Sequence, residues 1–377
     1  MRPTDPIQIG SVTISENSPV VVIAEGCDNH NGSLARAKEM AQAAKEAGAK
    51  MIKFQLHLPE DEMVSREEME RTSGAMFPKW GSLYGFVEQN LLKPEEHAEL
   101  MDYCRKISIQ YFCTPFSLKA AQLLNEMGAE GFKIGSGETE DLPFIEEVAK
   151  MGKPMMISTG MSTLAEIDLA VRQVAALNPQ LCLAHCVSIY PVKQLSQLRL
   201  GVIRHLRERF GFYVGYSDHT PPEGVFDDSG KWIFEETLIW TAIAAGARFI
   251  EKHFTLDRCT PDADSIFSHD PQTLLWLVKS VQACEQALSS EKTILKEEES
   301  VHIWAKRSIV AACDIPAGTE LTREMITSKR PGTGIRSKNY YMIMGTRTKY
   351  FIPEGKMILP DDLENINWMA AGYRILG

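Results

Sequence analysis

The chain has 377 residues and a formal net charge of −10, and 44% of its residues are hydrophobic and 24% charged. These fractions are typical of globular proteins, and the negative charge argues against nucleic-acid binding, which requires clustered Lys and Arg. No stretch approaches the roughly 20 apolar residues that cross a bilayer, and the first residues do not resemble a secretion signal. We therefore expect a cytoplasmic protein that binds neither nucleic acid nor membranes. The eight cysteines contain no CxxC pair, and we interpret them as reduced and mostly buried.

Short apolar, β-branched runs alternate with longer helical patterns along the first 288 residues. The expected strands are 20–25, 51–56, 110–114, 131–134, 154–158, 181–185, 212–215 and 248–251. The expected helices are 34–47, 94–107, 117–127, 141–151, 163–176, 195–209, 235–245 and 271–288. Eight βα units in a row are typical of a parallel sheet that closes on itself. The predicted fold class is therefore α/β, with a (β/α)8 TIM barrel over residues 1–288.

Three of the expected helix-to-strand joints follow one template. Gly48, Gly128 and Gly246 each suit a left-handed helix stop, and a charged residue follows five positions later. These charged residues are Lys53, Lys133 and Glu251. Such glycines are common in α/β proteins, but the charges are not explained by the joint. The template therefore predicts that the three charged residues occupy equivalent strand positions.

A second, smaller domain is predicted after the barrel. Residues 289–306 are rich in Glu and Lys and are expected to form a helix or linker. Residues 307–377 contain two Pro-x-Gly turns, at 316–318 and 353–355, between short apolar runs. This pattern predicts a compact β-rich module of two similar halves. Because about 70 residues are only marginally stable alone, we expect the module to dock on the barrel or on another subunit.

Polar residues follow the expected barrel strands, at the position where the active sites of TIM barrels lie. Lys53, Gln55 and His57 alternate on one strand and therefore face one way, as do Glu251 and His253 on another. Buried Lys and Glu side chains need partners, which can be each other, a metal or an anion. The other candidates at strand ends are Glu25, Asn29, His30, Thr114, Lys133, Ser136, Ser158, Thr159, His185, Ser188, Tyr190, Ser217 and His219.

These candidates predict two kinds of site. Lys53 and Lys133, with three serines and nearby glycines, favour a pocket for a phosphate or carboxylate, and a structural ion pair is the alternative for each lysine. The three serines are Ser136, Ser158 and Ser217. His219 and His253 favour an open site for a divalent metal, and a core or capping role is the alternative for each histidine.

Taken in order, the motifs at the strand ends resemble those of the sialic acid synthases and the related legionaminic and pseudaminic acid synthases, over nearly the whole chain. The motifs are Ile23-Ala24-Glu25, Asn29-His30-Asn31-Gly32-Ser33, Ile52-Lys53-Phe54-Gln55, Thr114-Pro115-Phe116-Ser117, Phe132-Lys133-Ile134-Gly135-Ser136-Gly137-Glu138, Ser158-Thr159-Gly160-Met161, Ile189-Tyr190-Pro191, Ser217-Asp218-His219-Thr220, Glu251-Lys252-His253-Phe254-Thr255 and Lys329-Arg330-Pro331-Gly332-Thr333-Gly334. The tail resembles the antifreeze-like, or SAF, domain of this family. The resemblance implies a transferase that condenses phosphoenolpyruvate with an N-acetylmannosamine-type sugar, free, 6-phosphorylated or diacetamido, and releases phosphate.

The resemblance also implies a role for each site residue. His219 and His253 would hold a divalent cation, Mn²⁺ first and Mg²⁺ or Co²⁺ as alternatives, with Gln55 near its bound water. The residues implied to hold phosphoenolpyruvate are Lys53, Lys133, Ser136, Ser158, Ser188 and Ser217. Those implied to orient the sugar are Glu25, Tyr190 and Asp264. The catalytic set would be Glu25, Gln55, His219 and His253. Arg330 of the tail would reach the active site of the partner chain in a domain-swapped homodimer.

Two segments depart from familiar members of the family. About a dozen extra residues, at 222–234, separate the two histidines, and we expect a surface loop that reshapes the sugar pocket or its entrance. The segment 73–83 does not match the Asn that recognises the N-acetyl group in some sialic acid synthases. The amino sugar is therefore left open.

Two other functions are compatible with the residues. One is a Schiff-base pyruvate aldolase that uses Lys53 or Lys133, against which the paired histidines argue. The other is a carbohydrate-binding or ice-binding tail attached to an inactive barrel, against which the full set of strand-end residues argues.

Overall fold

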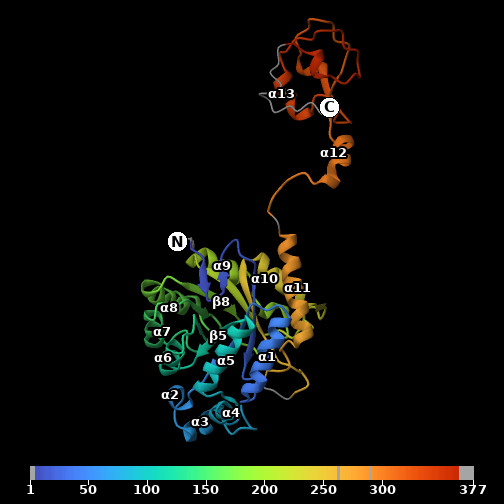
Figure 1. Ribbon diagram of the computed structural model, residues 1–377. Helices are drawn as coiled ribbons and strands as arrows, with labels where there is room; N and C mark the ends of the chain where they lie inside the picture. Colours follow the sequence, from blue (N-terminus) through green and yellow to red (C-terminus); the bar gives the residue numbers. More distant parts are fainter. Residues whose placement is uncertain (1–4, 261–263, 289, 365–377) are drawn as a thin grey trace. The chain divides into compact units, whose positions relative to one another are not determined.

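The computed structural model describes residues 5–260, 264–288 and 290–364. Contacts along the chain divide it into two compact units, with the division between residues 289 and 290 (Figure 1). The predicted boundaries, with a linker at 289–306, stay a prediction. In the described part of the chain, no helix is long and apolar enough to cross a membrane.

The first unit is a nearly closed barrel of parallel strands. Its strands are β3 (Val21–Cys27), β4 (Met51–Leu56), β5 (Gln110–Pro115), β6 (Phe132–Ile134), β7 (Met155–Ser158), β8 (Leu181–Cys186), β9 (Tyr213–Asp218) and β12 (Ala247–His253). They are hydrogen-bonded in the order β5-β4-β3-β12-β9-β8-β7-β6, and the end strands β5 and β6 lie next to each other. The predicted TIM barrel is confirmed.

Helices cover the outside of the barrel (Figure 1). They are α1 (Leu34–Glu46), α5 (Pro94–Ile107), α6 (Leu118–Glu126), α7 (Leu142–Lys150), α8 (Leu164–Leu177), α9 (Gly201–Phe210), α10 (Glu235–Ala244) and α11 (Pro271–Ala287). Each matches an expected helix, but α9 begins later than expected. Residues Leu195–Gln197 form a separate 3-10 turn, and Arg199 has a φ of 49°, which interrupts a right-handed helix.

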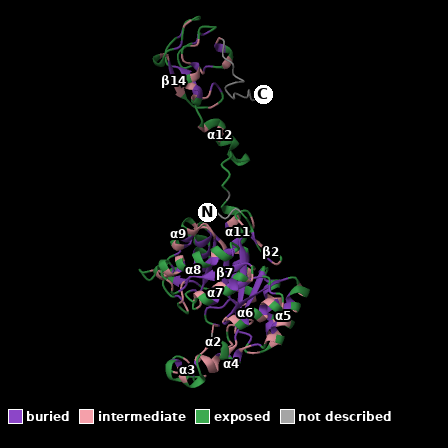
Figure 2. Ribbon diagram, turned by 90° about the vertical axis from the view of Figure 1, so that its left-hand side faces the viewer, coloured by how far each residue is buried: buried purple, intermediate pink, exposed green. Residues whose placement is uncertain are grey.

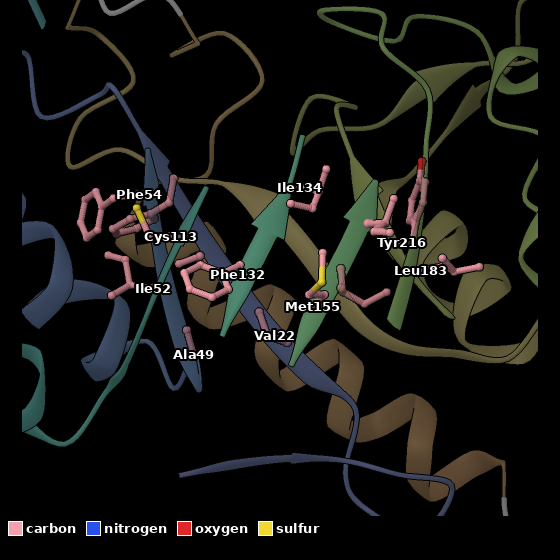
Figure 3. Packing of buried hydrophobic residues seen from close by; sticks show 14 of the residues in the cluster. Val22, Ala49, Ile52, Phe54, Cys113, Phe132, Ile134, Met155, Leu183 and Tyr216 are labelled. Atoms are coloured by element: carbon pink, nitrogen blue, oxygen red, sulfur yellow. The ribbon is translucent and has the colours of Figure 1, made fainter. Parts of the chain in front are cut away.

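The barrel core has two layers. The larger layer lies between the strands and the surrounding helices and includes Val22, Ile52, Phe132 and Leu183, whose side chains are drawn in Figure 3. The strands are almost wholly buried, whereas the helices expose their outer faces (Figure 2). The second layer fills the barrel interior and contains inward side chains such as Phe249.

A short hairpin that was not predicted packs against this interior layer. It consists of β1 (Ile7–Ile9) and β2 (Val12–Ile14). All four of its terminal residues are buried in the same cluster as Phe112 and Phe249. The hairpin therefore fills one end of the barrel, and the cavity described below lies at the ends where the strands finish.

Two segments are inserted between elements of the barrel. Between β4 and α5 lie α2 (Pro59–Glu62), α3 (Arg66–Ser73) and α4 (Leu83–Asn90). The extra segment at 222–234 forms a small hairpin of β10 (Val225–Phe226) and β11 (Trp232–Ile233). In this hairpin the rings of Phe226 and Trp232 meet edge to face, with centroids 4.7 Å apart.

The second unit contains a small antiparallel sheet of β13 (Ser308–Ala311) and β14 (Ile326–Lys329). Its helices are α12 (Glu299–Ala305) and α13 (Tyr340–Ile343), and its 3-10 turns are Lys296–Glu298, Arg323–Met325, Ser337–Asn339 and Pro360–Asp362. The two predicted Pro-x-Gly turns each place glycine at positive φ, 77° for Gly318 and 80° for Gly355. Ile315 and Ile352, which precede these turns, pair with each other in the unit's apolar core. The two turns predicted from the sequence thus follow residues that pair with each other, whereas the similarity of the two halves stays a prediction.

Candidate active site

A cavity of about 360 Å³ lies at the carboxyl ends of the barrel strands. The predicted site residues that line it are Glu25, Lys53, Gln55, Lys133, Ser136, Ser158, Tyr190, Ser217, His219, His253 and Asp264. Thr114 and Glu251 line it as well. They come together because side chains alternate along each strand, so that residues two apart face the barrel interior. Their proximity is observed, whereas the role of each remains a prediction.

Glu251 is the electrostatic centre of this cavity. Its carboxylate accepts hydrogen bonds from the Lys133 ammonium at 2.7 and 2.9 Å, from Lys53 at 3.1 Å and from the Ser217 hydroxyl at 2.9 Å. Burial alone would raise the pKa of Glu251, but the charges of Lys133 and Lys53 outweigh burial and hold this pKa well below its usual range. Glu251 is therefore ionised and fixes both lysines in place.

Lys53 lies between two carboxylates. Its ammonium is 2.6 Å from Glu25 Oε2 and 3.1 Å from Glu251 Oε1. Desolvation by burial nevertheless lowers the pKa of Lys53 to about 8, and the nearby charge of Lys133 acts in the same direction. Lys53 and Lys133 thus form ion pairs, which was the alternative to phosphate or carboxylate binding for each lysine. Both lysines also face the cavity.

The serine group lies on the wall formed by β7, β8 and the loop after β6. Ser136 Oγ donates to Ser158 Oγ at 3.0 Å and lies 3.7 Å from the Cys186 sulfur. Gly160 is required beside them, because a Cβ atom there would be 2.3 Å from Ser188 Oγ and 2.6 Å from Ser136 Oγ. Ser188 therefore adjoins this group, although it does not line the cavity.

His219 and His253 are neighbours in the cavity wall, with ring centroids 5.2 Å apart. The Nδ1 atom of His219 lies 3.0 Å from the carbonyl oxygen of Val187. This contact requires a proton on Nδ1, so that in the neutral imidazole the lone pair is on Nε2, which is the state in which a histidine binds a metal. The donor set therefore fits a divalent cation. Tyr190 and Phe267 pack against the two rings, at centroid distances of 4.4 Å to His219 and 4.9 Å to His253.

Two further possible metal ligands, Cys27 and Asp264, adjoin His253. The sulfur of Cys27 lies 3.5 Å from His253 Nδ1 and 3.2 Å from Asp264 Oδ2. The sequence did not single out Cys27, because a cysteine at the end of an apolar run resembles a buried hydrophobic residue. The signal that was available is its position two residues after Glu25, directly at the end of a barrel strand.

Several candidates from the sequence lie behind the cavity wall and support loops. Asn29 donates to the carbonyl of Phe254 at 2.9 Å, and Thr159 donates to the carbonyl of Ala184 at 3.0 Å. His185 contacts the carbonyl of Leu198 at 2.8 Å, on the outer side of β8. His30 is also buried, and its Nδ1 accepts from the backbone of Gly32. These contacts give the four residues structural roles.

An acidic group that the sequence did not predict flanks the cavity near Gln55. His57 stacks on Phe116 and lies 2.9 Å from Glu62 and 3.1 Å from the Gln55 side-chain oxygen. Burial raises the pKa of Glu138, which lines the cavity, to about 7. Burial also raises the pKa of Asp28, beside His57, to about 6. On this side of the cavity, Glu138 therefore offers a carboxyl group that can donate or accept a proton near neutral pH.

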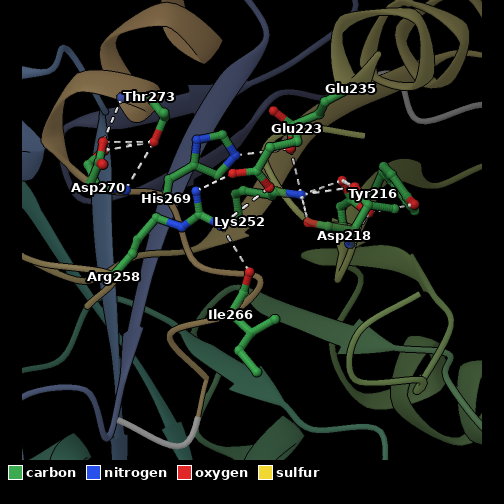
Figure 4. A network of polar contacts seen from close by, with 11 residues as sticks. Tyr216, Asp218, Glu223, Glu235, Lys252, Arg258, Ile266, His269, Asp270 and Thr273 are labelled. Atoms are coloured by element: carbon green, nitrogen blue, oxygen red, sulfur yellow. Dashed lines mark hydrogen bonds and ion pairs between the residues drawn. The ribbon is translucent and has the colours of Figure 1, made fainter. Parts of the chain in front are cut away.

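A buried ion network lies on the opposite face of β9 and β12 (Figure 4). Lys252 contacts Asp218 at 2.7 Å and Glu235 at 2.6 Å, and its side chain is fully buried. His269 joins through Glu235, at 2.9 Å. Because Lys252 lies between Glu251 and His253, the network holds the outer face of the strand whose inner face lines the cavity.

Arg330 belongs to the second unit. Its Nε donates to the carbonyl of Ala305 at 3.1 Å, and its guanidinium lies over the ring of Trp304. The predicted action of Arg330 in a partner's site stays a prediction.

The chain is similar to proteins of one family along both units. Residues 40–293 match the NeuB family, and residues 306–364 match the SAF domain. An uncharacterized protein of Methanocaldococcus jannaschii is 36% identical, over 95% of this chain and 98% of its own. The N,N'-diacetyllegionaminic acid synthase of Legionella pneumophila is 32% identical, over 91% of this chain and 94% of its own. The structure of the N-acetylneuraminic acid synthetase of Leptospira borgpetersenii, solved with citrate, is 28% identical with a TM-score of 0.68, over 79% of this chain and 95% of its own.

Proposed function

Because the chain belongs to the NeuB family and carries a SAF domain, we propose that it is a nonulosonic acid synthase that condenses phosphoenolpyruvate with an N-acetylmannosamine-type amino sugar. The observation that carries this proposal is the cavity, where two lysines and a serine group lie beside two histidines. The lysines and serines suit the binding of a phosphate and a carboxylate. The two histidines suit a metal that polarises an aldehyde.

In the proposed mechanism, Lys53, Lys133 and the serine hydroxyls bind the phosphate and carboxylate of phosphoenolpyruvate. Glu251 holds the two lysines in place, as its hydrogen bonds to both indicate. Glu25, Tyr190 and Asp264 orient the sugar so that its aldehyde carbon faces carbon 3 of phosphoenolpyruvate. The new bond joins these two carbons, water adds at carbon 2, and phosphate leaves. A divalent cation bound at His219 and His253 would supply Lewis-acid polarisation of the aldehyde.

Phosphate release tests this function and identifies the sugar. The purified protein would be assayed with phosphoenolpyruvate, a divalent cation, and a panel of free and 6-phosphorylated N-acetylmannosamine and diacetamido sugars. We expect release with one class of sugar and none after EDTA treatment. Full activity in EDTA with a borohydride-trapped pyruvate adduct would instead indicate the Schiff-base aldolase. No release with any sugar would indicate an inactive barrel.

The lowered pKa of Lys53 predicts a pH dependence. Lys53 is charged below pH 8 and neutral above it, because burial lowers its pKa from 10.5 to about 8. We therefore expect kcat/KM for phosphoenolpyruvate, which reports ionisations of the free enzyme, to fall as the pH rises through about 8. Lys53→Arg keeps its charge and should show no fall there. A wild-type profile that stays flat to pH 10 would contradict this assignment.

We also propose a cytoplasmic, domain-swapped homodimer in which Arg330 completes the sugar site of the partner. The family resemblance of the segment around Arg330 supports this arrangement. Arg330→Ala is then expected to raise the KM for the sugar far more than the KM for phosphoenolpyruvate. Steady-state kinetics with each substrate varied in turn would check it, and equal effects on both constants would reject the role.

A further inference from the structure

Three potential metal ligands from separate segments meet beside the cavity. They are the thiol of Cys27 at the end of β3, the ring of His253 at the end of β12 and the carboxylate of Asp264 in the following loop. Cys27 Sγ lies 3.5 Å from His253 Nδ1 and 3.2 Å from Asp264 Oδ2, and the last two atoms are 3.3 Å apart. The three atoms form a compact, nearly equilateral triangle.

The size of this triangle fits one face of a tetrahedral metal site. Bond lengths of about 2.3 Å to sulfur and about 2.0–2.1 Å to nitrogen and oxygen place neighbouring ligands of a tetrahedral ion about 3.3–3.6 Å apart. The observed separations of 3.2, 3.3 and 3.5 Å need little adjustment to reach these values. Hydrogen bonds between the same three groups would have similar lengths. A second observation therefore has to distinguish a metal site from a hydrogen-bonded cluster.

The backbone of Cys27 supplies that observation. Cys27 has a φ of 34°, in the region that favours glycine, at an irregularity in the pairing of β3 with β4. A side chain in this conformation costs about 1–3 kcal/mol and persists where a function requires it. Its amide donates to Glu25 Oε1 at 2.8 Å, which holds the bend in place. Glycine would fit this bend without strain. A function of the thiol would explain why cysteine occupies the position instead.

The surroundings of Cys27 also suit a ligand. The residue is only 2% exposed, and its sulfur is turned toward an imidazole and a carboxylate. A divalent cation between the three groups would hold the thiol in its deprotonated form, because a thiol that coordinates a metal binds as the thiolate.

We propose that Cys27 is a thiolate ligand of the divalent cation and that Cys27, His253 and Asp264 form a sulfur, nitrogen and oxygen site whose fourth ligand is His219. Binding releases the thiol proton to solvent. A thiolate favours borderline-soft ions, so Zn²⁺ or Co²⁺ should bind in preference to the Mn²⁺ that the family resemblance implies. The proposal deepens the proposed function, since His253 belongs to its metal pair, but cation binding can be measured without turnover.

Cobalt spectroscopy tests the sulfur ligand directly. The purified full-length protein would be freed of metal and titrated with Co²⁺, and the near-ultraviolet absorption that arises only from sulfur-to-cobalt charge transfer would be recorded. We expect this band in the wild type and in Cys186→Ser, which changes the cysteine beside His219. We expect its loss in Cys27→Ser and in Cys27→Gly, whose glycine suits the local backbone and so guards against misfolding. A wild type that lacks the band, or a Cys27 variant that keeps it, overturns the proposal.

Affinity separates a ligand from a residue that only orients one. Competition with a metal indicator would give the dissociation constants for Zn²⁺ and Mn²⁺. Removing a residue that only orients a metal ligand costs about 10–100-fold in affinity, so we expect Cys27→Ser to weaken Zn²⁺ binding by more than about 100-fold and Mn²⁺ binding by less than about 10-fold. Equal losses of affinity for both ions would indicate that Cys27 only orients a ligand, and they would overturn the proposal. A cobalt–sulfur band without phosphate release would instead contradict the proposed function alone.

Discussion

Replacing Lys252 with methionine is expected to destabilise the barrel by about 3–5 kcal/mol, because breaking a buried ion pair leaves an uncompensated charge. Lys252 has a fully buried side chain and contacts Asp218 at 2.7 Å, Glu235 at 2.6 Å and the carbonyl of Thr220 at 2.6 Å. Methionine retains most of the length of lysine, so the substitution removes mainly the charge and its hydrogen bonds. Two buried carboxylates would then face each other without a cation.

Urea unfolding of the full chain, followed by circular dichroism, measures this effect as a lower midpoint at unchanged slope. Lys279→Met is the matched control, since Lys279 is exposed on α11 and its loss should change the free energy of unfolding by less than about 0.5 kcal/mol. Adding Asp218→Asn to Lys252→Met should recover part of the stability, because it removes one of the two carboxylates. If Lys252→Met unfolds at the same midpoint as its control, the network contributes nothing to stability.

The sequence was sufficient to predict the barrel and most of its cavity wall because both follow from short-range rules. The alternation of side chains placed Lys53 with Gln55, and Glu251 with His253, on the inner faces of β4 and β12. The recurrent glycine joint predicted that the charged residues of three strands are equivalent. It did not predict that one carboxylate, Glu251, bonds to both lysines, because that pairing depends on distances across the barrel.

The features that the sequence did not predict depend on local irregularity or on three-dimensional packing. Cys27 lies in the site because the backbone bends after Glu25. The residue pattern of an apolar run does not predict such a bend. The hairpin of β1 and β2 does carry an alternating pattern around Gly10, but its strands are only three residues long. The helix α9 begins later than predicted because Arg199 adopts a left-handed conformation that is uncommon for residues other than glycine and asparagine. Each miss reflects a conformation that tertiary contacts impose.

His219→Ala is expected to reduce the proposed phosphate release by at least about 1,000-fold, since Lewis-acid stabilisation of a transition state is worth several kcal/mol and each 1.36 kcal/mol is tenfold in rate. His219 lines the cavity and adjoins His253, and the contact of its Nδ1 with Val187 leaves Nε2 available. The fold should tolerate the change, because His219 follows β9 at the cavity wall rather than filling the apolar core. The rate of phosphate release, measured with saturating phosphoenolpyruvate and sugar, checks the prediction.

The control for this variant separates lost chemistry from lost structure. His205→Ala removes an exposed histidine of α9 and should retain wild-type activity. The melting temperature of His219→Ala should stay within a few degrees of the wild type, since a change of 1 kcal/mol shifts it by about 2–4 °C in a domain of this size class. Because Lys53, Lys133 and the serines are untouched, His219→Ala should still bind phosphoenolpyruvate with nearly wild-type affinity. Activity that survives in a folded His219→Ala variant would remove this histidine from the catalytic set and leave cation binding to His253 and its neighbours Cys27 and Asp264.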